Sequence, residues 1–540
     1  MPAKQKSALI SVYNKEGIVP FAKELVALGW KIYSSGGTAK ALTAGGVETT
    51  DVAELVGGEA ILGHRVVTLS REVHAGLLAR HDNDTDIQEM EDLGIPFIDL
   101  LCNDLYPLKE EIAKPDSTMD SVIQQTDIGG PTMLRSAAKG GRIVICNAED
   151  RNRVIEWLKS GEPEREQFTQ ELRAKSEAYV ADYVLASAKY HGYGKYDGFV
   201  GERILECKYG ENGYQTPAAL YSTHTTDPLA LDKFEVVLGT APSYNNLCDV
   251  DRLVQTMTHI VAGQKANQLF SSKIFVAVAA KHGNSCGASI SADPAEVTKK
   301  ALEGDLRAVF GGLVILNFEV DDKIAEILLT HEMPEGRRRL LDGIMAPGFT
   351  EKAIESLQRK GDKCRLLANA ALATLGVDSL DNSQRFRYVR GGFLTQPNYT
   401  YIPRLTNADI TKGKNEEKNN HSDMLLAWAI GSTSNSNTVT IVKNGMLIGN
   451  GVGQQDRVGG AKLAVMRATD AGHDTVGAIA YSDSFFPFTD GVETLSSAGI
   501  QAIFATSGSV RDPEVKDFCK KNGVTLYLVP DSEARGFFGH

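Results

Sequence analysis

Short apolar runs alternate with segments of helical spacing over the first 150 residues, and this alternation restricts the fold more than any other feature. Ala8–Val12 is apolar, and Ile18–Leu28 then carries its apolar residues on one helical stripe. Lys31–Ser34 is again extended and precedes a helical segment at Thr38–Ala44. Further buried strands are predicted at Phe97–Cys102 and Arg142–Asn147. Strands separated by helices are typical of βαβ units, so this part predicts an α/β fold with a parallel sheet.

The pattern changes after residue 150. Arg151–Leu158 and Glu164–Tyr190 are rich in Glu, Ala, Arg and Lys and predict long helices. His191–Gly198 interleaves Tyr and His with Gly and indicates a loop, so we expect a boundary near residue 199 and domains at 1–199 and 200–540. Strands of the second part are predicted at Ile274–Ala280, Arg307–Leu316, Thr438–Val442, Val476–Tyr481, Gln501–Ala505 and Thr525–Val529.

The most polar stretch, Thr411–His421, is predicted to be a solvated loop. A helix over Met424–Ile430 follows, with Ser422 or Asp423 as its N-cap. No repeat of solenoid period is evident.

Composition excludes several classes of protein. The chain has 540 residues and a net charge of −12, which argues against a protein that coats nucleic acid or an anionic membrane. Seven scattered Cys without a CxxC motif predict neither a disulfide framework nor a zinc ribbon, and we expect a cytoplasmic location. The first residues read as a strand rather than a signal peptide, and no apolar run approaches the length of about 18 residues that a membrane span needs. Neither the zinc-deaminase signature nor HExxH occurs, so we predict no catalytic metal.

A Ser/Gly-rich turn, Ser34–Thr38, follows one predicted strand and precedes a helix. Its glycines allow close approach of a ligand, and the helix N-terminus offers free N–H groups that suit a phosphate monoester. Lys15 follows the first strand and could face the same phosphate, because ligands bind at the carboxyl ends of parallel strands. A plain strand-to-helix turn and a surface lysine explain these residues equally simply.

Two further segments combine glycine with basic residues. Asp127–Lys139 is a loop that enters a helix at Pro131, with Arg135 and Lys139 on one face. An amphipathic helix with a solvated basic face is the alternative. Gly449–Arg457 is the strongest local Gly cluster and precedes a helix, but taken alone it favours the interpretation as a plain turn.

A Lys-His pair lies at the end of the strand Ile274–Ala280. His282 could act as a general acid or base, and Lys281 could stabilise an oxyanion. The alternative is a capping His beside a solvated Lys. Cys286 could be a nucleophile, but its small neighbours favour a packed Cys equally. The aromatic turn Phe485–Phe488 is either core or a surface for stacking on a planar ring.

Together these motifs resemble those of the bifunctional AICAR formyltransferase/IMP cyclohydrolase family of late purine biosynthesis, where AICAR is 5-aminoimidazole-4-carboxamide ribonucleotide. The resemblance covers nearly the whole chain in the same order. The matching segments are SVYNKEG (11–17), SSGGTAKAL (34–42), ILGHRVVTL (61–69), LYP (105–107), DIGGPTMLRSAAK (127–139), KYGEN (208–212), SYNNLCDVD (243–251), KHGNSCGA (281–288), FGG (310–312), DGIMAPGF (342–349), VRGGFLTQ (389–396), GVGQQDRV (451–458), SDSFFPFTDGV (482–492) and RGFFGH (535–540).

The resemblance implies that residues 1–199 form a methylglyoxal-synthase-like domain that closes formyl-AICAR to IMP. The carboxamide nitrogen attacks the formyl carbon and water leaves, so holding a near-attack conformer does most of the work and no cofactor is needed. Lys139 is implied as the proton-transfer residue. The implied substrate positions are Ser11, Lys15, Ser35, Gly36, Gly37, Thr38, Arg65, Thr68, Asp104, Tyr106 and Asp127.

The resemblance further implies that residues 200–540 form a formyltransferase built of cytidine-deaminase-like α/β units without their zinc. It would move a formyl group from 10-formyltetrahydrofolate to the amine of AICAR, a poor nucleophile because its lone pair is conjugated with the ring carboxamide. His282 is implied as the base, Lys281 as its cationic partner, and Asn437 as a stabiliser of developing charge. The implied nucleotide positions are Lys208, Tyr209, Tyr214, Gly311, Asp342, Arg457, Phe485 and Arg535, and the folate positions are Val458, Asp490 and Ser509.

The chain departs from the family pattern in both parts. Val67 replaces a basic nucleotide contact, Ser70-Arg71 replaces His-Pro, and Asp104 replaces the usual Asn. In the second part Tyr214 stands where the family has an active-site His, and Lys208 replaces an Arg and loses its bidentate phosphate geometry. One alternative is therefore a formyltransferase with a weakened cyclohydrolase, and another is a non-catalytic nucleotide-binding protein on the same fold. The resemblance implies a homodimer that binds AICAR, formyl-AICAR, IMP and folate.

Overall fold

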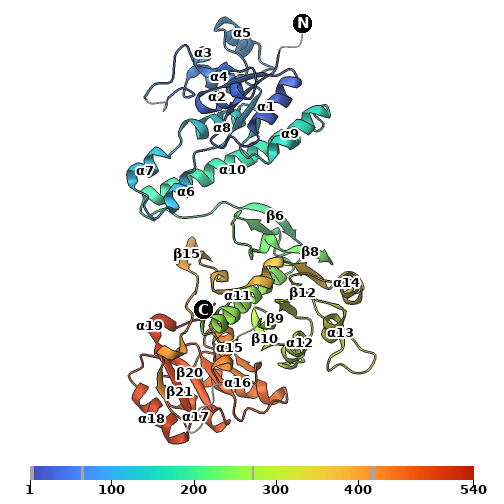
Figure 1. Cartoon of the computed structure of the whole chain (residues 1–540), viewed down its shortest axis with the longest axis vertical. Coiled ribbons are helices and arrows are strands. Elements are labelled where there is room, and N and C mark those ends of the chain that lie inside the picture. Colours follow the sequence, from blue (N-terminus) through green and yellow to red (C-terminus); the bar gives the residue numbers. More distant parts are fainter. Residues whose placement is uncertain (1–4, 63–65, 271–272, 414–419, 540) are drawn as a thin grey trace. The chain divides into compact units, whose positions relative to one another are not determined.

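The computed structural model describes residues 5–62, 66–270, 273–413 and 420–539. The chain divides into two compact units, Met1–Gly201 and Glu202–His540, and each has a sheet and hydrophobic cores of its own (Figure 1). The expected α/β class is confirmed: the first unit holds a parallel sheet and the second a large mixed sheet. In the described part of the chain, no helix is long and apolar enough to cross a membrane.

The first unit is built on a five-stranded sheet of order β3-β2-β1-β4-β5, in which every neighbouring pair is parallel. Its strands are β1 (Ser7–Ser11), β2 (Lys31–Ser34), β3 (Thr50–Asp51), β4 (Leu100–Asn103) and β5 (Ile143–Ile145). Its helices are α1 (Ile18–Ala27), α2 (Gly36–Ala44), α3 (Val52–Val56), α4 (Arg71–Leu78), α5 (Asp84–Asp92), α6 (Leu108–Ala113), α7 (Met119–Gln124), α8 (Gly129–Lys139), α9 (Asp150–Lys159) and α10 (Arg165–His191).

Helices cover both faces of this sheet, which explains why its strands are apolar at successive positions. Ile10 of β1 packs into a core with residues of α1, α2 and α9, whereas its neighbour Leu9 packs into a second core with residues of α4, α8 and α10. Because all five strands run the same way, their carboxyl ends meet at one edge. Polar residues that follow β1, β2 and β4 therefore gather there.

The second unit is built on a twelve-stranded sheet of order β16-β21-β20-β19-β17-β18-β10-β9-β11-β12-β13-β8. Its strands are β8 (Glu235–Leu238), β9 (Phe275–Lys281), β10 (Asn284–Ser291), β11 (Leu313–Leu316), β12 (Gly343–Ala346), β13 (Arg365–Ala368), β16 (Asp409–Thr411), β17 (Val439–Lys443), β18 (Met446–Gly451), β19 (Ile479–Ser482), β20 (Ala502–Ser507) and β21 (Thr525–Pro530). Two separate hairpins pair β6 (Glu202–Cys207) with β7 (Ala218–Ser222) and β14 (Gln384–Val389) with β15 (Gly392–Pro397).

Helices connect these strands on both faces of the sheet. They are α11 (Tyr244–Ala266), α12 (Pro294–Glu303), α13 (Asp322–Thr330), α14 (Glu351–Leu357), α15 (Asn420–Ser432), α16 (Arg457–Asp470), α17 (Asp490–Ser497), α18 (Asp512–Asn522) and α19 (Asp531–Ala534), with 3₁₀ turns at Leu231–Lys233, Ala370–Thr374, Val377–Ser379 and Leu405–Asn407. The long helices α11 and α15 pack against each other and share one core with the sheet (Figure 1). The helices α12 to α14 and α16 to α18 contribute to two other cores.

The twelve strands consist of two copies of one arrangement. The elements from β8 to β13 and those from β16 to β21 follow the same order of strands and helices with the same parallel and antiparallel pairings. The copies meet where β10 pairs antiparallel with β18. The hairpin turns His282–Gly283 and Asn444–Gly445 both have positive φ, as tight two-residue hairpins favour. In each copy an aspartate of the preceding helix accepts a hydrogen bond from the turn glycine, Asp249 at 2.5 Å and Asp423 at 2.6 Å.

Two expectations about elements were wrong. The strand predicted over Arg307–Leu316 is limited to β11, because the carboxylate of Asp305 accepts hydrogen bonds from two backbone N–H groups and turns the chain before it. The helix predicted from Met424 begins at Asn420, and Asp423 binds the Asn444–Gly445 turn instead of capping the helix. Residues 414–419 of the predicted polar loop lie outside the described residues.

Candidate active sites

Lys15 and the turn before α2 lie together at the carboxyl edge of the first sheet. The Lys15 Nζ donates hydrogen bonds to the backbone oxygens of Val12 (2.6 Å) and Tyr13 (2.9 Å), and a Cβ added to Gly37 would lie 3.8 Å from it. The ammonium group is thereby held beside the first turn of α2. A helix N-terminus and a lysine together make a site for an anion.

The residues of this turn differ in whether their polar groups remain available to a ligand. Thr38 is buried, and its hydroxyl is bonded to both the N–H (3.1 Å) and the oxygen (3.0 Å) of Val12, so it fastens α2 to β1. Ser35 is the N-cap of α2 but makes no side-chain cap hydrogen bond, and Gly36 has a φ of +56°. The hydroxyl of Ser35 and the first N–H groups of α2 are therefore the groups that a phosphate could use. Ser11 ends β1 at the same edge.

Asp104 shapes the neighbouring loop. Its carboxylate accepts hydrogen bonds from the N–H groups of Tyr13 and, at 3.2 Å, of Asn14. Burial raises the pKa of Asp104, although these bonds and nearby cations oppose the rise. The ring of Tyr106 lies edge-on to that of Tyr13 with centroids 5.7 Å apart. The unexpected carboxylate at position 104 thus orders the backbone that carries Lys15.

Asp127, Tyr106 and Thr68 gather at the start of α8. The Asp127 carboxylate accepts a hydrogen bond from the Gly130 N–H at 2.8 Å, and burial raises the pKa of Asp127. Burial, and secondly the charge of Asp127, raises the pKa of Tyr106. A Cβ on Gly129 would lie 2.8 Å from the Thr68 Oγ1, so only glycine fits the approach of this turn to Thr68.

Lys139 is not brought to this group. It is the last residue of α8, and at 1.5 Å per residue it lies about 15 Å along the helix axis from Gly129. Its side chain is exposed. Arg65, the remaining predicted residue of this unit, lies outside the described residues.

In the second unit, Lys281, Gly311 and Asp342 lie close together. Lys281 ends β9, and its Nζ donates a hydrogen bond to the Phe310 oxygen at 2.9 Å. A Cβ on Gly311 would lie 4.0 Å from this nitrogen, and the N–H of Asp342 bonds the neighbouring Gly312 oxygen at 3.0 Å. His282 follows in the hairpin turn with its side chain exposed and a φ of 55°.

Asn437, Arg457 and Asp483 form a second, largely buried group. Arg457 donates to the Asn437 Oδ1 at 2.6 Å and pairs with the Asp483 carboxylate at 3.2 Å. Asn437 in turn donates through its Nδ2 to the Gln454 oxygen at 2.8 Å. Both polar atoms of the Asn437 amide are therefore fixed in direction, and its amide dipole is oriented by a guanidinium.

Phe485 and Arg535 adjoin this group. Arg457 donates to the Phe485 oxygen at 2.7 Å, and the Arg535 guanidinium lies 5.7 Å from the centre of the Phe485 ring. Arg535 also pairs with Asp531 at 2.6 Å. Two guanidinium groups and an aromatic ring in this arrangement suit an anionic ligand that carries a planar ring.

The two groups lie at one edge of the twelve-stranded sheet. The Asn284 Oδ1 accepts a hydrogen bond from the Asn435 N–H at 3.3 Å, and the Asn450 side chain donates to the Ser285 oxygen at 3.1 Å. These bonds cross the junction of β10 and β18. The hairpin turn of the first copy and the strand ends of the second copy thus face the same edge.

The predicted folate positions follow β18, β19 and β20 at this edge. Val458 is in the first turn of α16, next to Arg457, and Asp490 begins α17. The ring of Phe488 lies 4.9 Å from the guanidinium of Arg511, which links the loop before Asp490 to the loop of Ser509.

Lys208, Tyr209 and Tyr214 lie in the loop after β6, and Tyr214 is 83% exposed. The loop is tied to the start of α11 by a 3.2 Å hydrogen bond from the Asn245 side chain to the Glu211 oxygen. One helical turn further, Asp249 bonds the His282 turn. Among the described residues, no hydrogen bond joins this loop to the group around Arg457.

Sequence reasoning missed the supporting roles of three aspartates. Asp249 holds the His282 turn, Asp483 pairs with Arg457, and Asp531 accepts from the hydroxyl of Ser484 at 2.9 Å as well as pairing with Arg535. Asp483 and Asp531 come directly after buried strands, and that position was the available signal.

Cys286 is half-buried, and its thiol donates a hydrogen bond to the Ala279 oxygen at 3.5 Å, which favours the interpretation as a packed residue. Burial raises its pKa to about 12, so the reactive thiolate is scarce near neutral pH. Among the described residues, no group of three or more His, Cys, Asp or Glu side chains is placed to hold a metal ion.

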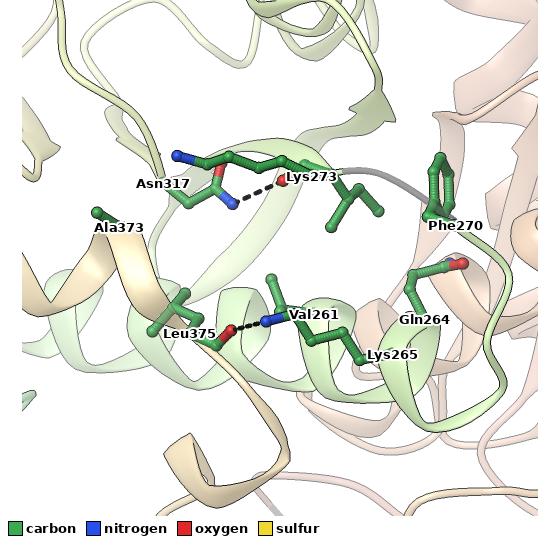
Figure 2. A pocket seen from close by; sticks show the side chains of 9 residues that line it. Val261, Gln264, Lys265, Phe270, Lys273, Asn317, Ala373 and Leu375 are labelled. Atoms are coloured by element: carbon green, nitrogen blue, oxygen red, sulfur yellow. Dashed lines mark hydrogen bonds between the residues drawn. The ribbon is translucent and has the colours of Figure 1, made fainter.

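A cavity of about 320 Å³ (Figure 2) is lined by Ile274, just before β9, and Asn317, just after β11, so it lies at the edge of the large sheet opposite Lys281, which ends β9. Its walls include Val261 and Leu375, and Lys265 donates to the Leu375 oxygen at 2.6 Å across it. The buried amides of Gln264 and Asn317 each bond backbone oxygens, at 2.8 Å and 3.0 Å. The cavity is therefore separate from the groups around Lys281 and Arg457.

Comparison with known proteins agrees with both parts of the chain. The family model of the AICARFT/IMPCHase bienzyme matches residues 137–467, and that of the MGS-like domain matches residues 17–132. Proteins named bifunctional purine biosynthesis protein PurH are 36% identical in Anoxybacillus flavithermus, 34% in Bacillus cytotoxicus and 35% in Bacillus cereus. Each of these matches covers 97% of this chain and 98% of the relative. The chain belongs to the AICARFT/IMPCHase bienzyme family.

Proposed function

We propose that this bifunctional enzyme of purine biosynthesis makes IMP in two steps, with formyl transfer in the second unit and ring closure in the first. The match to bifunctional relatives over 97% of the chain is the observation that supports both activities. The assignment of one activity to each unit is supported by the two separate groups of polar residues, each at one edge of its own sheet.

Formyl transfer needs a base for a weakly nucleophilic amine and a stabiliser for the tetrahedral oxyanion. In our proposal the AICAR amine attacks the formyl carbon of 10-formyltetrahydrofolate and the bond from that carbon to N10 breaks. His282 takes the amine proton and returns it to N10, so the proton count balances. The ammonium of Lys281, 2.9 Å from a backbone oxygen at the same edge, and the oriented amide of Asn437 oppose the developing negative charge.

The remaining predicted residues would bind the two substrates. Arg457, Arg535 and the Phe485 ring suit the nucleotide, because cations and a planar surface match its phosphate and base. The loops of Asp490 and Ser509, linked by Phe488 and Arg511, would hold the folate.

Ring closure depends mainly on holding the carboxamide nitrogen and the formyl carbon in the orientation for attack. Lys15 and the N-terminus of α2 would bind the phosphate, since a cation and free N–H groups meet there. Asp127 and Tyr106, adjacent at the start of α8, would contact the base and move protons as the carboxamide nitrogen attacks and water leaves. Nothing in the comparisons favours the alternative of a formyltransferase with a weakened cyclohydrolase.

The decisive experiment supplies the full-length protein with AICAR and 10-formyltetrahydrofolate, follows release of tetrahydrofolate and identifies the nucleotide. We expect IMP. Accumulation of formyl-AICAR without IMP would contradict the proposed ring closure, and no release of tetrahydrofolate would contradict formyl transfer.

We also propose that the protein is a homodimer, as the resemblance to the family implies. Sedimentation equilibrium should give a mass of twice 58.4 kDa. A monomer mass at the protein concentration used for assays would contradict this proposal.

A further inference from the structure

The last described residues lie across the loop that carries Asn437. The Phe538 N–H donates to the Ser434 oxygen at 3.0 Å, and the Ser436 N–H donates to the Gly539 oxygen at 3.1 Å. Asn435 and Gly539 form an isolated parallel bridge. We call residues 535–539 the tail and residues 433–437 the asparagine loop. Backbone bonds run from the tail to the loop and from the loop to the tail, so the two segments are ordered together.

The Phe538 side chain anchors this tail between two cations. Its ring centre lies 3.8 Å from the guanidinium carbon of Arg252 on α11 and 3.7 Å from that of Arg385 on β14. Arg385 also donates to the Phe538 oxygen. Burial is the main cause that lowers the pKa of both arginines, so the guanidinium groups are partly desolvated. The attraction between a cation and an aromatic face is stronger when the cation is desolvated.

One of these arginines also holds the asparagine loop directly. Arg252 donates to the Thr433 oxygen at 2.7 Å and to the Asn435 Oδ1 at 3.2 Å. The same guanidinium therefore stacks on Phe538 and bonds the loop. Removing the ring would free the tail and would also remove the surface that orients Arg252.

The loop ends in the group that we assign to catalysis. Ser436 donates to the Asp483 carboxylate at 2.7 Å, and Asn437 contacts Arg457 at 2.6 Å. Gly453 donates to the Asn435 oxygen at 3.0 Å on the side of the sheet. The tail and the sheet thus hold the loop through different backbone groups.

We propose that Phe538 is a positioning residue for formyl transfer: gripped by Arg252 and Arg385, it holds the tail against the asparagine loop and keeps the Asn437 amide in its catalytic orientation. This inference rests on the role proposed for Asn437. Phe538 itself touches no reacting atom in this proposal. Its loss should therefore reduce the turnover of bound substrate more than the binding of substrate.

The test uses full-length Phe538→Ala, Phe538→Leu and Phe538→Tyr variants. We expect Phe538→Ala to lower the formyltransferase kcat by about 10- to 100-fold, because a small displacement of a catalytic group is costly. The KM values for AICAR and folate should change much less. Phe538→Tyr keeps the ring between the cations, so its kcat should be near that of wild type. Phe538→Leu keeps bulk without the ring, so its kcat should lie between those of Phe538→Tyr and Phe538→Ala.

Two controls belong to the same chain. Phe393→Ala removes a half-exposed ring from β15, the partner strand of β14, and should leave kcat unchanged. Cyclohydrolase turnover of formyl-AICAR should be unchanged in every Phe538 variant. Hydrogen exchange should show faster exchange of the Ser436 N–H in Phe538→Ala and not in Phe393→Ala.

A Phe538→Ala variant with wild-type kcat would overturn the inference, as would equal losses in Phe538→Tyr and Phe538→Ala. If Phe538→Ala does not fold, Arg385→Gln decides: a selective fall in formyltransferase kcat supports the anchor, and an unchanged kcat overturns it. Asn437→Ala tests the role of Asn437 separately from the role of Phe538. Wild-type transfer by Asn437→Ala would overturn the proposed role of Asn437, whereas loss in Asn437→Ala with full activity in Phe538→Ala would overturn only the role of Phe538.

Discussion

At the scale of single residues, the resemblance gives two lysines of the first unit different tasks, phosphate binding to Lys15 and proton transfer to Lys139, and the structure separates them. Lys15 lies beside the first turn of α2, while Lys139 lies at the far end of α8. We expect Lys15→Met to raise the KM for formyl-AICAR about 10- to 100-fold, because a hydrogen bond to a charged group is worth about 1.5–3 kcal/mol. Lys139→Met, its matched control, should leave this KM unchanged in steady-state assays of ring closure. A KM that is raised in Lys139→Met and unchanged in Lys15→Met would contradict the proposed phosphate site.

The contrast shows what motifs transfer and what they do not. The residues around Ser35 and Lys15 could be predicted, because strand ends of a parallel sheet converge on one edge. The family resemblance places Asp127 and Lys139 in one site, but the helix that the same motif predicts carries its last residue about 15 Å from its first. Asp423 was expected as a helix cap, but a turn distant in sequence uses its carboxylate.

His259 is a residue whose burial should be visible in the dependence of stability on pH. It is buried, its Nδ1 is 2.7 Å from the Gln255 oxygen and its Nε2 is 3.1 Å from the Tyr399 oxygen. Burial lowers the pKa of His259 below its ordinary value of 6.5, although the hydrogen bonds to the Gln255 and Tyr399 oxygens oppose the fall. Below pH 6.5 the histidine of the unfolded chain binds a proton more readily than the buried His259 does. The contribution of neutral His259 to the free energy of unfolding is therefore fully present above pH 6.5 and is lost as the pH falls toward the pKa of the folded state.

We therefore expect the free energy of unfolding of the second unit to fall more steeply in wild type than in His259→Gln between about pH 7 and about pH 5. Urea unfolding followed at several pH values measures the difference. Parallel curves for wild type and His259→Gln would refute the expectation.

At the scale of elements, glycine decides how closely a helix can lie on the large sheet. A Cβ on Gly287 of β10 would overlap the Ala301 carbonyl of α12. Gly287→Ala should destabilise the second unit by about 1–3 kcal/mol, the usual effect of overpacking. Gly392→Ala on β15 meets no atom within 4 Å and should change stability by less than about 0.5 kcal/mol. Denaturant midpoints compare the two, and equal midpoints would contradict the packing argument.

Elements with strong apolar patterns could be predicted from sequence, and the misses have local causes. The strand Lys31–Ser34 agrees in both bounds, because a glycine lies two residues beyond each of its ends. The strand expected from Arg307 fails because one aspartate side chain caps a turn inside an apolar stretch. The duplication of the large sheet leaves little trace in the sequence, since the pairing order of strands depends on contacts between distant segments.

At the scale of the whole molecule, each unit has the sheet and cores that independent folding requires. We expect the fragment 1–201 alone to fold and to convert synthetic formyl-AICAR to IMP at a rate close to that of the full chain. Circular dichroism and the absorbance change on IMP formation check this. A folded fragment without activity would show that ring closure needs residues beyond 201.

The two copies in the large sheet use its two edges unequally. Each copy sends its hairpin turn to one edge and the carboxyl ends of its parallel strands to the other, so the edge with Lys281 and Arg457 combines half of one copy with the opposite half of its sibling. A single copy would thus contain only parts of two sites, whereas a symmetric dimer of single copies would contain two complete sites. Fusion of such a pair into a single polypeptide makes one of the two redundant. At that second edge the turn reads Lys443-Asn444-Gly445, with asparagine in the place of His282, so the base that we propose has a counterpart on one side only.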